Sequence, residues 1–207
     1  MSLRVSSLDG RVTLTLPKHA PLRAARAFLD EQAEWLKGAR AGLTPRVPVA
    51  PGVRLPIEGR LVTVVAGGPG APRLEGDAIL VRANGAGARI EAFLKTLARE
   101  RLAAAVDVHA RRIGAEAGRI TLRDTRSRWG SCSSRGDLMF SWRLILAPPS
   151  VLDYVAAHEV AHLRHMDHSA AFWALTARLC PAHAEAREWL RREGPGLHRY
   201  VFREGRA

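Results

Sequence analysis

Apolar and polar residues alternate with a period of two at both ends of the first 85 residues, and a helical period separates these stretches. Residues 3–8 and 11–16 flank Asp9-Gly10, a pair typical of a tight β-hairpin turn. The segment 21–40 has apolar residues at helical spacing, which predicts one helix ending at Gly38 or Gly42. After a proline-punctuated linker at 43–52, alternation returns and predicts small antiparallel strands in two segments, 54–68 and 72–83.

The pattern changes near residue 86, where helical periodicity dominates. Residues 89–115 read as one long amphipathic helix whose apolar face carries Ile90, Phe93, Leu94, Leu97, Leu102 and Val106. Two strand-like runs follow, 119–131 and 137–147, around a Ser134–Asp137 turn. Three helical segments come after them, at 148–166, 169–180 and 182–194. Pro149 near a helix start, with Ser150 and Asp153 as a capping box, predicts where the first of these begins.

These elements predict an α+β protein in two parts. Residues 1–85 form a β-rich N-terminal part with one helix, and residues 86–207 form the domain that carries the chemistry. Hydrophobic residues make up 47% and charged residues 25% of the chain, which is the composition of a globular protein. The sequence has neither an apolar run long enough for a bilayer nor a signal peptide, so we expect a cytoplasmic protein without a membrane partner. The sequence leaves the oligomeric state open.

The net charge of +12 is compatible with nucleic-acid binding, but it is a weak indication. The positive residues are almost all arginine and are scattered along the chain, which fits a general compositional bias better than a binding surface. Cys132 and Cys180 belong to no CxxC pair, which excludes a cysteine-rich zinc site and predicts two reduced thiols.

The densest concentration of chemistry is "HEVAHLRHMDHSAAFW", residues 158–173. His158 and His162 are four residues apart on a predicted helix, so both imidazoles lie on one face, as two ligands of a tetrahedral zinc do. Glu159 projects beside them, where it can accept a proton from an activated water. HExxH occurs by chance in unrelated proteins, but its place within a helix and the histidines that follow favour one Zn²⁺ per chain.

Two histidines, His165 and His168, compete for the role of third ligand. On an unbroken helix His165 would share the face of His158, but the sequence after it looks like a helix end with Asp167 or Ser169 capping a new helix. A turn at Met166-Asp167 would let His168 reach the metal from outside the first helix and leave a fourth position open. We therefore predict His168 as the ligand and His165 as a residue outside the coordination sphere.

The stretch "SRWGSCS" follows a predicted strand and is the candidate substrate-binding segment. Trp129, Gly130 and Ser131 could border the cleft and pair with an extended peptide, since glycine permits close approach of another backbone. The structural alternative is that Trp129 packs on the helix and Gly130 only turns the chain, and we weigh the two equally for Trp129. Core packing is the preferred interpretation for Tyr154 and for the aromatic pair Phe172 and Trp173.

Residues 123–173, and above all "SRWGSCSSRG" and "HEVAHLRHMDHSAAFW", resemble the YgjP-like metallopeptidase family, related to the SprT and WLM zincins. The resemblance extends over almost the whole chain. It implies a minimal zincin-like fold, with zinc held by His158, His162 and His168 and with Glu159 as general base. It leaves the substrate open.

The leading hypothesis is a zinc-dependent hydrolase acting on a peptide or protein. His165, Arg128 and Tyr154 are candidates to stabilise the oxyanion of the transition state. Two alternatives stay open. The family has also been described as a metal-dependent pyrophosphatase acting on UTP, which the abundant arginine would suit. The SprT relatives suggest a DNA-associated protease.

Overall fold

The computed structural model describes residues 1–6, 10–41 and 45–203. The chain forms two compact units that divide between residues 46 and 47. Each unit combines helices with small sheets, so the predicted α+β class is confirmed. None of the helices in the described part of the chain combines the length and apolar character needed to cross a membrane.

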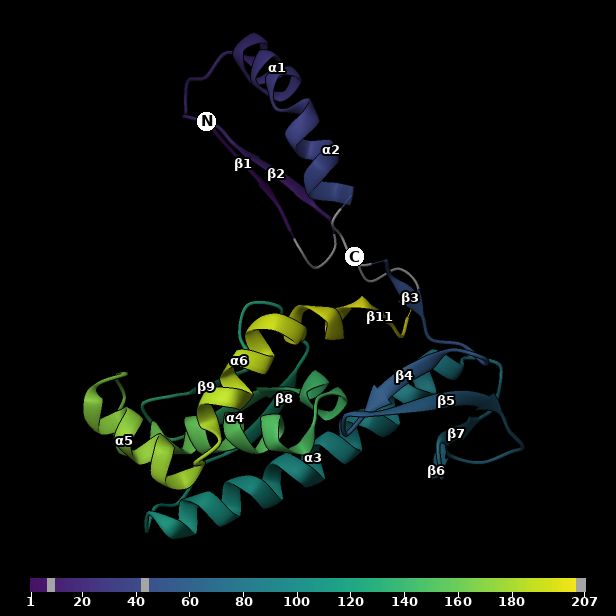
Figure 1. The fold of residues 1–207 in the computed structure, drawn as a ribbon, viewed down its shortest axis with the longest axis vertical. Coiled ribbons are helices and arrows are strands. Elements are labelled where there is room, and N and C mark those ends of the chain that lie inside the picture. Colours follow the sequence, from purple (N-terminus) through teal and green to yellow (C-terminus); the bar gives the residue numbers. More distant parts are fainter. Residues whose placement is uncertain (7–9, 42–44, 204–207) are drawn as a thin grey trace. The chain divides into compact units, whose positions relative to one another are not determined.

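The first unit is a β-hairpin followed by two helices (Figure 1). Strand β1, Ser2–Val5, pairs antiparallel with β2, Val12–Thr15, as the alternation predicts. Asp9 of the expected turn and Gly42, one of the two expected helix ends, lie outside the described residues. The single helix expected over 21–40 is wrong. The structure has two helices instead, α1 (Leu22–Glu31) and α2 (Ala33–Ala41), separated by Gln32. The Gln32 N–H donates to the Phe28 carbonyl at the end of α1, and the Gln32 carbonyl accepts from the Leu36 N–H of α2.

The second unit begins with a four-stranded sheet in the order β4-β5-β7-β6. The two predicted alternating segments supply its strands: β4 Arg54–Ile57, β5 Arg60–Ala66, β6 Arg73–Glu75 and β7 Ala78–Val81. Glu58 and Gly59 both have positive φ in the turn between β4 and β5. A Cβ on Gly59 would lie 3.0 Å from the Cα of Pro148, so this turn packs closely against the residue that precedes helix α4, Pro149–Ala161.

Helix α3, Ala86–Arg112, follows the sheet and measures about 40 Å at 1.5 Å per residue. Its buried face repeats every fourth residue, through Ile90, Leu94, Ala98, Leu102 and Val106, close to the predicted apolar face. The domain boundary expected between residues 85 and 86 falls at the start of this helix, inside the second compact unit.

A three-stranded sheet in the order β8-β10-β9 follows α3. Strand β8, Ile120–Arg123, is parallel to β10, Leu138–Ser141, and β9, Gly130–Cys132, is antiparallel to β10 at the edge of the sheet. The strand expected over 137–147 ends early, because residues Trp142–Leu146 form a 3₁₀-helix, η1. All five of its residues are buried, whereas a strand with one solvated face would alternate.

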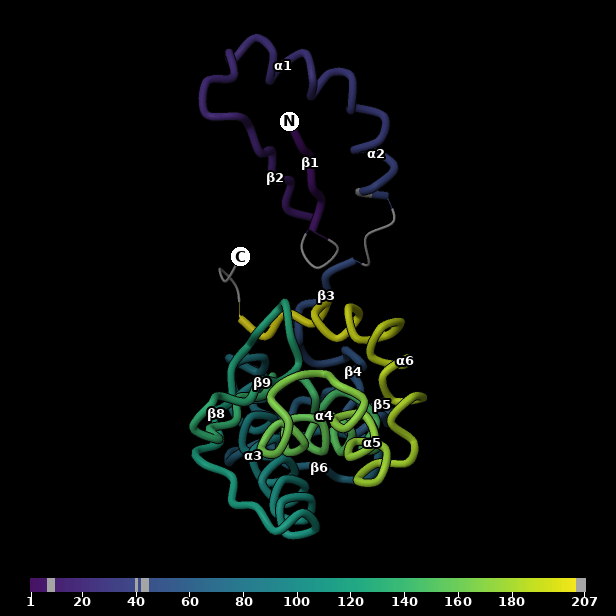
Figure 2. The backbone as a smooth tube through the Cα atoms, turned by 90° about the vertical axis from the view of Figure 1, so that its left-hand side faces the viewer, coloured from purple at the N-terminus to yellow at the C-terminus, as the bar shows by residue number. Residues whose placement is uncertain are grey.

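Helix α4, Pro149–Ala161, is the buried centre of the second unit. It contacts α3, β9, α5 (Ala170–Leu179) and α6 (His183–Glu193), and Figure 2 shows it among these helices. The expected capping box at its start is wrong. Pro148 occupies the N-cap position without a side-chain hydrogen bond, and the Asp153 carboxylate instead lies 2.8 Å from Nε2 of the buried His109 on α3.

One arginine, Arg143, binds the C-terminal segment. This segment consists of the 3₁₀-helix η2 (Gly194–Arg199) and the strand β11 (Tyr200–Val201). Arg143 of η1 makes a two-pronged ion pair with Asp124 at 2.6 and 3.2 Å and donates to the carbonyls of Leu197 and Tyr200. Strand β11 also pairs in parallel with β3, Val47–Pro48, which lies within the predicted linker. A buried guanidinium with all these partners keeps η2 in a fixed position.

Candidate metal centre

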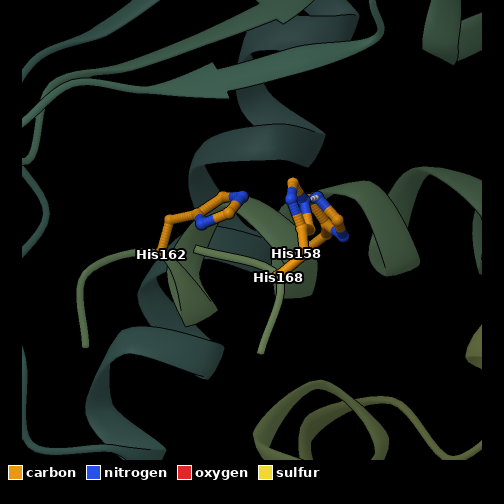
Figure 3. A group of neighbouring side chains, drawn as sticks. All are labelled: His158, His162 and His168. Atoms are coloured by element: carbon orange, nitrogen blue, oxygen red, sulfur yellow. Dashed lines mark hydrogen bonds between the residues drawn. The ribbon is translucent and has the colours of Figure 1, made fainter. Parts of the chain in front are cut away.

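Three histidines converge at the C-terminal end of α4. The ligand nitrogens of His158, His162 and His168 all lie within 4.8 Å of one another, and Nε2 of His158 is 3.2 Å from Nε2 of His168. Figure 3 draws the three side chains: His158 comes from the helix, His162 is its C-cap, and His168 comes from the segment beyond. Two zinc–nitrogen bonds of about 2.0–2.1 Å at a tetrahedral angle separate the nitrogens by about 3.3 Å. The His158–His168 separation matches that value, and the wider separations require a small rotation of an imidazole.

The end of α4 and the chain that follows decide which histidine joins the pair. The helix ends at Ala161 with His162 as its C-cap, five positions earlier than the predicted end at Met166. Beyond it, Arg164 donates to the carbonyls of Ile113 and Gly114 and so ties the loop to the end of α3. The predicted cap of the next helix is confirmed, because the Ser169 hydroxyl accepts from the Phe172 N–H at the start of α5. His168, directly before this cap, is thereby returned to the open end of α4.

His165 contributes to the candidate metal centre through its backbone carbonyl. Its carbonyl oxygen accepts a hydrogen bond of 2.9 Å from Nδ1 of His162. With a proton fixed on Nδ1, the lone pair of His162 is on Nε2, which is the tautomer that a metal needs. The His165 side chain lines a different surface groove, together with Arg164 and Arg178.

Aromatic rings enclose the three imidazoles on the protein side. Phe172 is fully buried, and its ring stacks on His162 with the centroids 4.5 Å apart and meets His158 and His168 edge-on. The Trp173 ring lies 5.8 Å from the same two imidazoles. Phe172 is a core residue, as the sequence predicts, whereas Trp173 is partly buried and packs against the core, and the two rings line the protein side of the site.

The surroundings of His158 and His162 favour neutral imidazoles. Burial is the main cause that lowers the pKa of His158 to about 4, and the neighbouring imidazoles and Arg187 lower it further. Burial also lowers the pKa of His162, against the opposing effect of its hydrogen bond to the His165 carbonyl. Neutral imidazole is the form that coordinates a metal. The three convergent nitrogens therefore fit a zinc ion: the pKa is lowered for His158 and His162, and His162 is also held in the required tautomer.

Glu159 lies on the side of α4 that faces strand β9, and it is only 5% exposed. Burial raises its pKa to about 8, although the positive charge of Arg128 acts in the opposite direction. A divalent cation at the adjacent histidines would favour the carboxylate form and counteract this shift.

Gly130 is the residue of β9 that makes room for Glu159. A Cβ at this position would lie 2.4 Å from Oε1 of Glu159 and 2.7 Å from both Cδ and Cγ. No real side chain tolerates such distances, so only glycine lets the carboxylate occupy this place.

Strand β9 also leaves backbone groups free. Ser141 donates to the Trp129 carbonyl, and Ser133 donates to the Asp137 carbonyl. Because hydrogen-bonded pairs alternate in an antiparallel ladder, Ser131 bonds inward to β10, and the N–H and C=O groups of Gly130 and Cys132 point to the open edge. Of the three predicted substrate-binding residues, Gly130 therefore faces this edge and Ser131 does not.

Trp129 packs against a neighbouring element and also lines a cavity beside the site. Its ring lies 5.4 Å from the His198 ring, and a Cβ on Gly194 would come within 2.9 Å of it, so it packs firmly on η2. It also lines a cavity of about 360 Å³ that reaches His158 and Glu159. The cavity wall includes Arg187, Leu190 and Arg191 of α6 as well. The sequence indicates only an amphipathic helix for α6, so it could not show that Arg187, Leu190 and Arg191 line a cavity.

The remaining candidates divide between the cavity and other places. Arg128 and Tyr154 line the cavity, whereas His165 lies in the other groove. Both cysteines are free thiols, as expected. Burial, with the nearby Glu159 as a lesser cause, raises the pKa of Cys132 to about 11, so its sulfur stays protonated at neutral pH.

Comparisons with known proteins bear on this site. The model of the YgjP-like family, described as a metallopeptidase domain, matches residues 1–193. No curated protein shows significant similarity to the chain. Among solved structures, the chain is similar to the crystal structure of the metallopeptidase zymogen of Pyrococcus abyssi abylysin. The sequence identity is 19% and the TM-score 0.41, over 48% of this chain and 98% of that chain.

Proposed function

Because the chain belongs to the YgjP-like metallopeptidase family, we propose that it is a zinc-dependent hydrolase that cleaves peptide bonds in the cavity beside Glu159. The observation that carries the proposal is the placement of a buried carboxylate directly after one of three convergent histidines and against an open strand edge. Metal ligands, a proton acceptor and a place for an extended chain are thus adjacent.

In this proposal His158, His162 and His168 hold one zinc ion. The ion would supply a Lewis acid for the scissile carbonyl and lower the pKa of the attacking water. The backbone carbonyl of His165 orients His162 through its Nδ1–H.

Glu159 acts as the general base. It accepts a proton from the attacking water and later delivers it to the leaving nitrogen of the cleaved peptide. Because Gly130 has no side chain, the Glu159 carboxylate fits in the space beside β9. Tyr154 and Arg128, which line the same cavity, are the candidates to donate to the developing oxyanion.

The substrate binds as an added strand on β9. The outward N–H and C=O groups of Gly130 and Cys132 are spaced to pair with an extended peptide, and this mode gives affinity through main-chain hydrogen bonds. Trp129 contributes a cavity wall, and Ser131 keeps β9 in register with β10.

The test uses the zinc-loaded full chain in three separate assays. Two of them measure hydrolysis, one with casein or a peptide library and one with UTP. The third measures salt-dependent binding to duplex DNA. We expect new peptide termini by mass spectrometry, in amounts that depend on added zinc. Release of pyrophosphate from UTP without any peptide cleavage would replace this proposal with the pyrophosphatase alternative. Tight, salt-sensitive DNA binding together with peptide cleavage would favour a DNA-associated protease.

A second expectation concerns Gly130. We expect Gly130→Ala to reduce peptide hydrolysis about 100-fold, because the added methyl group must displace the Glu159 carboxylate that it would otherwise meet at 2.4 Å. Zinc content should stay near that of the original protein. The matched control is Gly196→Ala, since a Cβ there has no neighbour within 4 Å. An active Gly130→Ala protein would mean that the position of Glu159 against β9 is not needed.

A further inference from the structure

Three arginines surround the cavity beside Glu159. Arg128 precedes the candidate substrate strand, and Arg187 and Arg191 belong to α6. Tyr154 and Leu190 give the same cavity an apolar part. Its volume of about 360 Å³ is at the lower end of the range for ligand pockets, which suits a single side chain with its flanking peptide groups.

The three arginines differ in how their charge is balanced. Arg191 makes a two-pronged ion pair with Glu188 at 2.6 and 2.8 Å, so most of its charge is neutralised. In the described part of the chain, neither Arg128 nor Arg187 makes an ion pair with a carboxylate. Because the positive charge of Arg128 acts on the Glu159 carboxylate, Arg187 is the arginine of this cavity that is left for a carboxylate of the substrate.

Arg187 is held in place without being neutralised. Its guanidinium carbon lies 4.9 Å from the centroid of the Trp173 ring, whose own centroid is 5.8 Å from His158 and His168. Stacking on an aromatic face orients a guanidinium and leaves its N–H edge free for a two-pronged hydrogen bond to a carboxylate. Arg187 and His158 line the same cavity, so the guanidinium lies beside the histidines of the candidate metal centre.

We propose that this cavity selects an acidic side chain, Asp or Glu, next to the scissile bond of the peptide, with Arg187 as its partner. The inference rests on the proposed peptidase function and adds its specificity. Charge-assisted, two-pronged hydrogen bonds to a carboxylate are among the stronger polar contacts in proteins, and the apolar wall suits the methylene groups of the acidic residue.

The experiment uses the zinc-loaded full chain and a peptide library with blocked termini, which excludes recognition of a terminal carboxylate. Mass spectrometry of the products gives the residues that flank each cleaved bond. We expect Asp and Glu to be enriched at one flanking position. In peptides matched at that position, Glu should exceed Gln by about tenfold or more in kcat/KM, the size expected for one hydrogen bond to a charged group.

Variants on α6 assign the preference to one residue. Arg187→Gln should remove the difference between Glu and Gln peptides, and Arg187→Lys should restore part of it. The matched control is Arg192→Gln on the same helix, which pairs with Glu193 and does not line the cavity, and it should keep the full preference. Equal cleavage of Glu, Gln and Lys peptides by the original protein would overturn the inference and leave the peptidase function intact.

A binding measurement separates the failure of the inference from the failure of the function. Fluorescence anisotropy of the same Glu and Gln peptides on the zinc-loaded Glu159→Gln protein requires no turnover. Tighter binding of the Glu peptide that depends on Arg187, without cleavage of any peptide by the original protein, would support the acidic subsite and refute the hydrolase. Equal binding of the two peptides would overturn the subsite.

Discussion

Glu159→Gln should lower peptide hydrolysis by at least about 100-fold while zinc stays near one ion per chain, because general acid–base catalysis contributes about 10²–10⁴ in rate. The amide is nearly the shape of the carboxylate and fits the space that Gly130 leaves. It cannot accept the proton of the attacking water. Zinc should remain because the converging donors are the three histidines. Initial rates on one quenched peptide, with zinc measured by mass spectrometry of the same sample, give both quantities.

The control for this variant is Glu185→Gln, which makes the same chemical change at an exposed position in the first turn of α6. Its rate and zinc content should match those of the original protein. A Glu159→Gln protein that lost its zinc would show that the carboxylate is a ligand. One that kept the full rate would show that another group accepts the proton.

The sequence predicts those parts of the site that depend on local spacing. His158 and His162 are one helical turn apart in any helix, and Glu159 then follows from its place in the same turn. The apolar period of α3 and the alternation of β4, β5 and β7 are local signals of the same kind, and these elements form where they are expected. The Ser169 cap is also local, because its partner is the N–H three residues later.

The sequence fails where a tertiary contact decides between local options. Asp153 has the spacing of a capping residue, but His109 on another helix takes its carboxylate. Trp142–Leu146 form a 3₁₀-helix in place of the end of the expected strand, and within it Arg143 is bound by Asp124 and by the carbonyls of Leu197 and Tyr200, all distant in sequence. The contact between Gly130 and Glu159 joins a strand to a helix, so the glycine alone could indicate a close approach but not its partner.

The arginines of the cavity show the same limit most clearly. Arg187 is one of many arginines in a strongly basic chain, and α6 reads as an ordinary amphipathic helix. Its stacking on Trp173 and its position beside Glu159 depend on the packing of α6 over α4. Charge composition alone gives only a weak indication of nucleic-acid binding, whereas the placement of Arg187 in the cavity favours a small acidic group.

The other large expected effect concerns the two histidines after α4. His168→Ala should weaken zinc binding by more than about 100-fold, because loss of an outer-shell partner alone costs about 10–100-fold and His168 supplies a ligand atom. His165→Ala should change zinc affinity by less than about threefold, since the contact to His162 uses the backbone carbonyl that alanine also has. The two positions are three residues apart in one loop, so each is the other's control.

The measurement is competition for zinc between each variant and a chromophoric chelator at fixed pH. Thermal unfolding of the metal-free proteins checks that both variants fold alike. The difference between them tests where α4 ends. If the helix ran on past Ala161, the side chain of His165 would share the face of His158, and His165→Ala would empty the site while His168→Ala stayed loaded. With α4 ending at Ala161, the imidazole that returns to the helix end is that of His168, and its removal leaves only two nitrogen donors for the zinc.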